Sequence, residues 1–225
     1  MQAGKKKKIL GIACVAALAV LTAALGVTLA VLTKGTEKRA NVFTFGNVKI
    51  ELTEDEWDEL EPGDTIVYPG RTVKKDPKIT NSGKNDLYAY IEIWTPTATV
   101  RTVAEDGVTV NAAAPCELFA FTPNKGWEEL FPSDWEEERT SGGSTYRVRL
   151  YGYTAGTLAP GESTATLFDA VTYANVLEGE LEKDAVLQMP VYAYAIQSDY
   201  LNETGSEGKE KMTDAFQKYR AAETN

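Results

Sequence analysis

Hydrophobic and polar residues alternate with a period of two along much of this chain. The clearest case is residues 87–94, where aliphatic residues alternate with aromatic and charged ones. Strict alternation of this kind predicts a half-buried β-strand. The polar residues 81–86 precede it and are typical of a turn, because Gly and Asn tolerate positive φ. Residues 76–94 are therefore predicted to contain a strand end, a turn and a second strand.

Comparable alternation recurs through the chain, and turns rich in Gly and Pro separate the alternating stretches. In the first stretch the alternation changes phase across Gly46 and Asn47, which predicts a bulge or a turn there. About eight to ten short strands predict an all-β fold, an antiparallel jelly roll or β-sandwich over residues 41–204. The strands are expected within residues 41–52, 76–81, 87–94, 97–103, 116–121, 146–151, 164–173 and 186–196.

The last residues change from this period to a helical one. Met212, Ala215, Phe216 and Tyr219 fall at positions i, i+3, i+4 and i+7, which form one apolar stripe on a helix. Residues 205–225 are thus predicted to form a C-terminal amphipathic helix and tail. Docking of this stripe on the domain's own surface is the simpler interpretation, and binding to another subunit is the alternative.

The N-terminal residues have the pattern of a secretory signal. Four lysines at positions 5–8 precede residues 9–32, a run of apolar residues, Gly and Thr. This pattern predicts a signal peptide, with a signal helix, over residues 1–30 and cleavage after Ala30. The run is also long enough to span a bilayer, so a retained membrane helix over residues 9–32 is the alternative. In both cases we expect the following domain to lie outside the cell.

Composition excludes several classes of function. The 225 residues have a net charge of −10, and residues 31–225 hold 19 basic and 33 acidic residues, a net charge of −14. Such a domain is a poor partner for nucleic acid, whose phosphates attract Lys and Arg. The chain has no histidine, which excludes Ser-His-Asp and Cys-His catalysis and zinc sites with imidazole ligands. Paired carboxylates can hydrolyse glycosides without histidine, but no pair stands out. No catalytic residue, cofactor or metal ligand is predicted.

Three further features have two interpretations each. Cys116 is the single cysteine after the signal; it fits a buried small hydrophobic residue better than a reactive thiol. The acidic residues 53–64 fit a solvated loop better than a cation-binding patch, because the Asp-x-Asp-x-Asp-Gly spacing of calcium loops is missing. Trp127 and Trp135 fit the core side of strands better than an exposed sugar-binding platform.

Several segments, in their order and spacing, resemble the TasA/camelysin family of Gram-positive bacteria. They are residues 40–50 (Ala-Asn-Val-Phe-Thr-Phe-Gly-Asn-Val-Lys-Ile), 62–63, 75–83 (Lys-Asp-Pro-Lys-Ile-Thr-Asn-Ser-Gly), 88–91, 158–162, 167–171 and 193–197. The alanine-rich signal also resembles those handled by the dedicated signal peptidase of that family. One departure is Val-Leu-Thr-Lys at residues 31–34. Family signals commonly end in an aromatic-Thr-Asp-like sequence, so the start of the mature chain is left open.

The resemblance implies a secreted jelly-roll protein of the cell surface and biofilm matrix, whose members assemble into fibres. In such fibres the N-terminal segment of one subunit completes the sheet of its neighbour. Here this donor segment corresponds to residues 31–45, with Val31, Leu32, Val42, Phe43 and Phe45 as its self-assembly residues. The implied partners are further copies in a head-to-tail polymer, the signal peptidase during export, and an accessory matrix protein if the chain does not polymerise alone.

We therefore expect a structural subunit and not an enzyme. Camelysin has been classed as a metalloprotease, but a chain without histidine cannot build the usual zinc site of one, so this activity is not expected here. The expected location is the extracellular matrix or cell surface, with residues 9–32 as a transient membrane tether. The physical basis is that an extended segment from another subunit can satisfy an unpaired strand edge. A surface adhesin or carbohydrate-binding β-sandwich is the alternative, with Trp127 and Trp135 as its candidate ligand residues.

Overall fold

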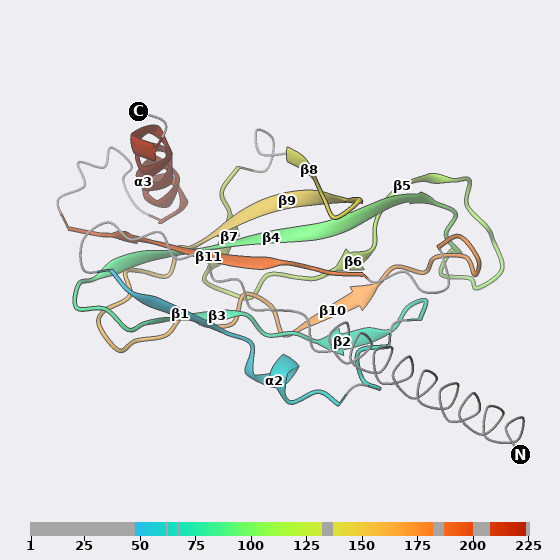
Figure 1. Cartoon of the computed structure of the whole chain (residues 1–225), viewed down its shortest axis with the longest axis horizontal. Coiled ribbons are helices and arrows are strands. Elements are labelled where there is room, and N and C mark those ends of the chain that lie inside the picture. Colours follow the sequence, from blue (N-terminus) through green and yellow to red (C-terminus); the bar gives the residue numbers. More distant parts are fainter. Residues whose placement is uncertain are drawn as a thin grey trace, which may run out of the picture. The chain divides into compact units, whose positions relative to one another are not determined.

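The structure, a computed structural model, describes residues 48–61, 63–66, 68–131, 137–181, 187–199 and 208–223. By its internal contacts the chain divides into two units, Met1–Glu37 and Lys38–Asn225, and every described residue belongs to the second. Within these residues, antiparallel strands make up most of the regular structure and two helices accompany them (Figure 1). The predicted all-β class is confirmed.

The largest sheet has six strands, and β4 runs through it. Strands β11, β4, β9 and β7 lie side by side, β5 pairs with the far end of β4, and β8 pairs with β9. All of these pairs are antiparallel. The strands are β4 (Leu87–Val100), β5 (Ala114–Glu117), β7 (Trp127–Glu129), β8 (Glu137–Ser141), β9 (Ser144–Tyr153) and β11 (Val191–Gln197).

Two smaller sheets complete the described part of the fold. In one, β1 (Ile50–Thr53) pairs with β3 (Lys78–Asn81). In the other, the order is β2 (Thr72–Lys74), β10 (Ala170–Tyr173) and β6 (Phe119–Ala120). A one-turn helix, α2 (Asp55–Asp58), follows β1 directly. The polar turn after β3 therefore carries the chain from a small sheet into the large one.

The expected break after residue 94 is wrong, because β4 continues through Pro96 as one 14-residue strand. Proline has no N–H to donate, but the Pro96 carbonyl accepts a hydrogen bond from the Leu118 N–H at 2.8 Å. Pro96 lies between the stretches of β4 that pair with β11 and with β5. At this junction a missing N–H interrupts neither ladder, so the strand tolerates the proline.

Residues 164–169 were also expected to be part of a strand, but only residues 170–173 form one. The preceding residues still bond to the segment containing β3. The Thr164 N–H donates to the Ile79 carbonyl and the Leu167 N–H donates to the Pro77 carbonyl, each at 2.8 Å. The two donors are three positions apart in the sequence but the two acceptors are only two positions apart, so the pairing is irregular and no continuous ladder forms.

The sheets surround one main hydrophobic core. Alternate residues of β4 and β11 point into it, as the period of two predicts for one face of a strand. The small sheets supply the opposite side through β1, β3 and β10. Core members from these elements are Ile50, Leu52, Ile79, Leu87, Ala89, Ile91, Ile93, Val171, Tyr173, Val191, Ala193 and Ala195.

The predicted C-terminal helix is present as α3 (Gly208–Glu223), and it covers the other face of the large sheet. Its stripe of Met212, Ala215, Phe216 and Tyr219 packs in a second hydrophobic cluster with residues of β4, β9 and β11. The Tyr90 hydroxyl donates to the Met212 carbonyl at 3.1 Å. The helix thus docks on its own domain, the simpler of the two expected arrangements.

Gly152 in β9 limits which side chains fit beneath α3. A Cβ atom at this position would lie 2.9 Å from Leu130 Cδ2 and 3.1 Å from Met212 Cε. We expect Gly152→Val to lower the free energy of unfolding by about 1–3 kcal/mol through overpacking. Gly152→Ala should cost less, because both neighbours are the ends of flexible side chains. Urea unfolding measures the difference, and wild-type stability of the valine variant would contradict this packing.

Candidate functional site

The predicted self-assembly residues Val31, Leu32, Val42, Phe43 and Phe45 lie outside the described residues, as does the predicted cleavage position, Ala30. The signal helix and the membrane span over residues 9–32 lie outside them too. Within the described ranges, no helix has the length and apolar character needed to cross a membrane. The structure therefore informs on the surfaces that could receive a donor segment.

Strand β11 pairs through one edge only in the described part of the chain. Its register with β4 is fixed at one end by the Ser198 N–H, which donates to the Asp86 carbonyl at 3.0 Å. Even-numbered residues of β11 therefore direct their backbone groups toward β4, and odd-numbered residues direct theirs away. The N–H and C=O groups of Val191, Ala193 and Ala195 form an open edge, which we call the β11 edge.

The β11 edge lacks the features that usually protect a strand from pairing with another chain. Its sequence, Val-Tyr-Ala-Tyr-Ala-Ile-Gln, has no charge, proline or glycine over seven residues. Other outer strands differ: β2 and β7 have three residues each. Strand β8 carries three charged residues, and β5 contains Pro115, which has no N–H. Among the described strands, β11 therefore offers the longest unprotected edge.

Strand β1 has an open edge as well. The Lys49 carbonyl accepts a hydrogen bond from the Ser82 N–H at 3.0 Å, so odd-numbered residues of β1 face β3. The backbone groups of Val48, Ile50 and Leu52 then point away from β3, and we call them the β1 edge. Cα atoms of β1 and β11 approach within 8 Å, but no backbone pairing between these two strands is present in the described chain.

Both open edges border the main core. Ile50 and Leu52 of β1 point their side chains into it, and so do Ala193 and Ala195 of β11. A strand added to either edge would therefore place alternate side chains against the same core. This geometry suits an extended segment with apolar residues two positions apart.

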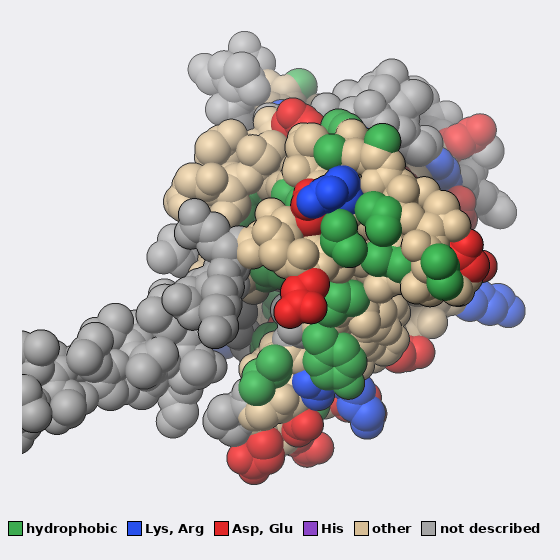
Figure 2. Space-filling view, turned by 90° about the vertical axis from the view of Figure 1, so that its right-hand side faces the viewer, with side chains coloured by type: hydrophobic (Ala, Val, Ile, Leu, Met, Phe, Trp, Pro, Cys, Tyr) green, Lys and Arg blue, Asp and Glu red, His purple; other side chains and the backbone are tan. Residues whose placement is uncertain are grey.

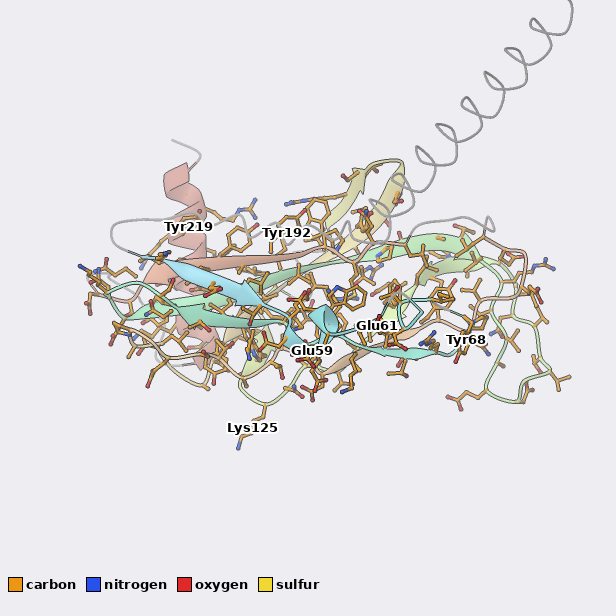
Figure 3. All side chains as sticks on the ribbon, turned by 60° about the horizontal axis from the view of Figure 1, so that its bottom comes forward. Glu59, Glu61, Tyr68, Lys125, Tyr192 and Tyr219 are labelled. Atoms are coloured by element: carbon orange, nitrogen blue, oxygen red, sulfur yellow. The ribbon has the colours of Figure 1, made fainter. Side chains whose placement is uncertain are left out.

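A polar cluster around the buried Glu92 lies on the outer face of the sheet beside β11. Trp94 Nε1 donates to Glu92 Oε1 at 2.6 Å, and Arg139 Nη1 lies 3.7 Å from the same oxygen. The ring of Tyr192 lies 5.2 Å from that of Trp94, centroid to centroid (Figure 3 labels Tyr192). Burial, and then the nearby Glu92 carboxylate, raises the pKa of Tyr194 above its usual range. Neutral tyrosine and paired charge therefore line this face.

The acidic segment after β1 differs from the solvated loop that was expected, because part of it is helical and ion-paired. Lysines of residues 74–78 pair with it: Lys75 Nζ lies 2.7 Å from Glu54 Oε1, and Lys78 Nζ lies 2.7 Å from Asp55 Oδ2. The hydrogen bond to Asp55 is the main cause that raises the pKa of Lys78. Figure 3 shows Glu59 beside α2, with Glu61 a little further along the chain. The lysines explain how so acidic a stretch folds against the domain.

The motif at residues 75–83 has structural roles in the described chain. Asp76 Oδ1 accepts the backbone N–H groups of Glu56 and Trp57 at 3.0 and 3.3 Å, which holds α2 in place. Asn81 is fully buried; its Nδ2 donates to the Leu158 carbonyl at 2.8 Å and its Oδ1 accepts the Gly83 N–H at 2.9 Å. These side chains hold α2 and the neighbouring loops in place.

The described residues include no cluster of three or more His, Cys, Asp or Glu side chains able to hold a metal ion. Cys116 is partly buried against the main core, and burial raises the pKa of its thiol, which disfavours the reactive thiolate. Trp127 is 4% exposed, and its Nε1 donates to the Ala165 carbonyl at 3.0 Å. The core interpretation of Trp127 is therefore correct, whereas Trp135 lies outside the described residues.

An apolar surface without an open strand lies elsewhere on the domain. The large exposed hydrophobic residues of the described chain are Ile66, Tyr68, Val108 and Val110. Figure 2 shows hydrophobic side chains grouped at the end of the molecule that lies at the right of Figure 1. These four residues lie outside the named strands, whereas the β11 edge offers unpaired backbone groups along a strand. The β11 edge is therefore the better candidate for binding an extended segment.

Comparison of the chain with protein-family models, with curated proteins and with solved structures finds no match. The strand edges were not identified from the sequence, because edge position depends on the order of strands within a sheet. One sequence signal was present: residues 191–197 combine strong alternation with no charged residue. Such a stretch is typical of either a central strand or an edge that another segment covers.

Proposed function

We propose that this chain is a secreted structural subunit of cell-surface or biofilm-matrix fibres, a jelly roll of the TasA/camelysin type. In this proposal the N-terminal segment of one subunit, residues 31–45, pairs with the β11 edge of the next. The unprotected, uncharged β11 edge is the observation that carries the proposal. The contact is head-to-tail and does not close, so it propagates into a filament.

The donor segment is long enough to cover the whole β11 edge. Fifteen residues span up to about 50 Å when extended, and the seven residues of β11 span about 23 Å. Phe43 and Phe45 are two positions apart, so both can face the core from one added strand. Beside the edge they would meet Ala193 and Ala195, whose small side chains leave room for aromatic rings across the strand pair.

Charge acts on this contact in two opposing ways. Residues 31–45 hold three basic residues and one acidic residue, a net charge of +2, and residues 46–225 hold 16 basic and 32 acidic residues, a net charge of −16. The donor segment is therefore attracted to the receiving domain at short range. Each whole copy still carries a net charge of −14, so copies repel one another at long range, and salt that screens this repulsion is expected to speed fibre growth.

The central test uses a proline in the β11 edge. The Ala195 N–H points away from β4, so Ala195→Pro removes a hydrogen-bond donor from the open edge and leaves the β4 ladder intact. We expect the secreted protein with Ala195→Pro to remain monomeric, with fibre yield reduced at least tenfold. Electron microscopy and light scattering of protein collected from the culture medium give the measurement.

The matched control is Ala195→Gly, which also changes the side chain but keeps the N–H. It is expected to form fibres, and both variants must show the wild-type circular dichroism spectrum. Because Ala195 is buried, a second pair at the end of β11, Gln197→Pro and Gln197→Ala, repeats the comparison at a partly exposed residue. Equal fibre yield from the proline and control variants, both folded, would contradict the proposed acceptor edge.

A further inference from the structure

The β1 edge differs from the β11 edge in one respect. The segment directly before β1 in the sequence is itself a candidate to pair with the β1 edge. Residues 43–50 read Phe-Thr-Phe-Gly-Asn-Val-Lys-Ile. Two alternating runs separated by two residues of the type Gly-Asn are typical of a β-hairpin with a tight turn. The second run of this pattern enters β1, which begins at Ile50.

We propose that residues 42–45 fold back on the β1 edge of their own subunit, through a two-residue turn at Gly46 and Asn47. This inference rests on the proposed function, because it concerns the same donor segment. In the secreted monomer the pairing would hold Phe43 and Phe45 in their own subunit. Fibre assembly would then exchange this strand from its own domain to the neighbouring one.

The backbone of β1 agrees with a two-residue turn. In such a hairpin the residues that flank the turn form a hydrogen-bonded pair, here Phe45 with Val48, and the next such pair is Phe43 with Ile50. This requires the N–H and C=O groups of Val48 and Ile50 to face the added strand. They do point away from β3, because Lys49 takes the bond to Ser82. A turn one residue longer would require the opposite set of backbone groups.

The side chains agree independently. Residues directly opposite each other in adjacent strands lie on the same face of the sheet. Val48 and Ile50 are buried in the main core, 2% and 5% exposed. The two phenylalanines would therefore enter that core, and Thr44 would lie on the same face as Lys49, which is exposed. Backbone direction and side-chain face both select the same register.

The test is residue-resolved amide hydrogen exchange on the dilute secreted monomer. The β1 edge amides of Val48 and Ile50 are expected to exchange at least tenfold more slowly than in a variant with residues 31–45 deleted. The amides of Glu51 and Thr53 bond to β3 and should be protected in both proteins, which makes them an internal control. Equal exchange of the Val48 and Ile50 amides in the two proteins would overturn the proposal.

Two substitutions of the turn extend the test. The double variant Gly46→Asn, Asn47→Gly creates the strongest two-residue turn signal, and it should slow fibre growth at least tenfold. Gly46→Val places a β-branched residue where positive φ is needed, so it should remove the protection of Val48 and Ile50. If the wild-type protein protects the Val48 and Ile50 amides but forms no fibres, the hairpin is supported and the fibre function is rejected. If it forms fibres but does not protect these amides, only the hairpin is rejected.

Discussion

Replacement of Glu54 by glutamine is expected to lower the free energy of unfolding by about 3–5 kcal/mol, the usual cost of leaving one partner of a buried ion pair alone. Glu54 Oε1 lies 2.7 Å from Lys75 Nζ, and the two side chains are only 7% and 5% exposed. The Lys75 ammonium also lies 4.8 Å from the centre of the Trp57 ring. Without the carboxylate, this buried lysine would lose its ion-pair partner.

The neighbouring pair of Glu56 and Lys74 gives a matched control. These side chains are half or more exposed, so Glu56→Gln is expected to change the stability by less than about 1 kcal/mol. Thermal and urea unfolding of the two variants measure the contrast. The combination Glu54→Leu, Lys75→Met removes both charges and should recover most of the lost stability. Equal stability of Glu54→Gln and Glu56→Gln would show that the buried pair does not stabilise the fold.

The local elements of this protein were predictable where the sequence pattern is periodic. Alternation placed β4 and β11, and the spacing of Met212, Ala215, Phe216 and Tyr219 placed α3. The predicted half-buried state of residues 87–94 is wrong, because residues 87–93 are all buried: one face of the strand lies in the main core and the other contributes Tyr88 and Tyr90 to the second hydrophobic cluster. Strand ends were less accurate. Strand β4 continues through Pro96 because this residue lies at a junction between two partner strands. The position of such a junction cannot be read from the sequence.

The candidate site required the order of the strands. The sequence of residues 53–64 predicted a solvated loop. Its lysine partners lie about twenty positions later, so the local pattern does not reveal the ion pairs. Only the fold brings Lys75 and Lys78 to Glu54 and Asp55. The same holds for the open edges: an edge strand and a central strand share the alternating pattern, and hydrogen-bond pairing distinguishes them.

Replacement of Phe216 by alanine is expected to release α3 from the sheet, because this ring is the centre of the second hydrophobic cluster. Its centroid lies 5.1 Å from that of Tyr90, 5.9 Å from Tyr194 and 6.3 Å from Phe131. Truncation of a buried phenylalanine costs about 3–5 kcal/mol. If the helix detaches while the sheets stay folded, the measured loss in free energy of unfolding cannot exceed the free energy of helix docking. Urea unfolding and limited trypsin digestion at the lysines of α3 distinguish detachment of the helix from destabilisation of the whole domain.

The adjacent residue gives the control, because Gln217 is exposed on the same helix. Gln217→Ala keeps the helical propensity and should change the stability by less than about 0.5 kcal/mol. Faster cleavage of Phe216→Ala, with the main core intact, would show that α3 docks as a separate layer. If Phe216→Ala left the stability unchanged but abolished fibres, the apolar stripe of α3 would instead bind another subunit. Since the stripe is already covered by residues of β4, β9 and β11 in one chain, we expect the loss of stability and not the loss of assembly alone.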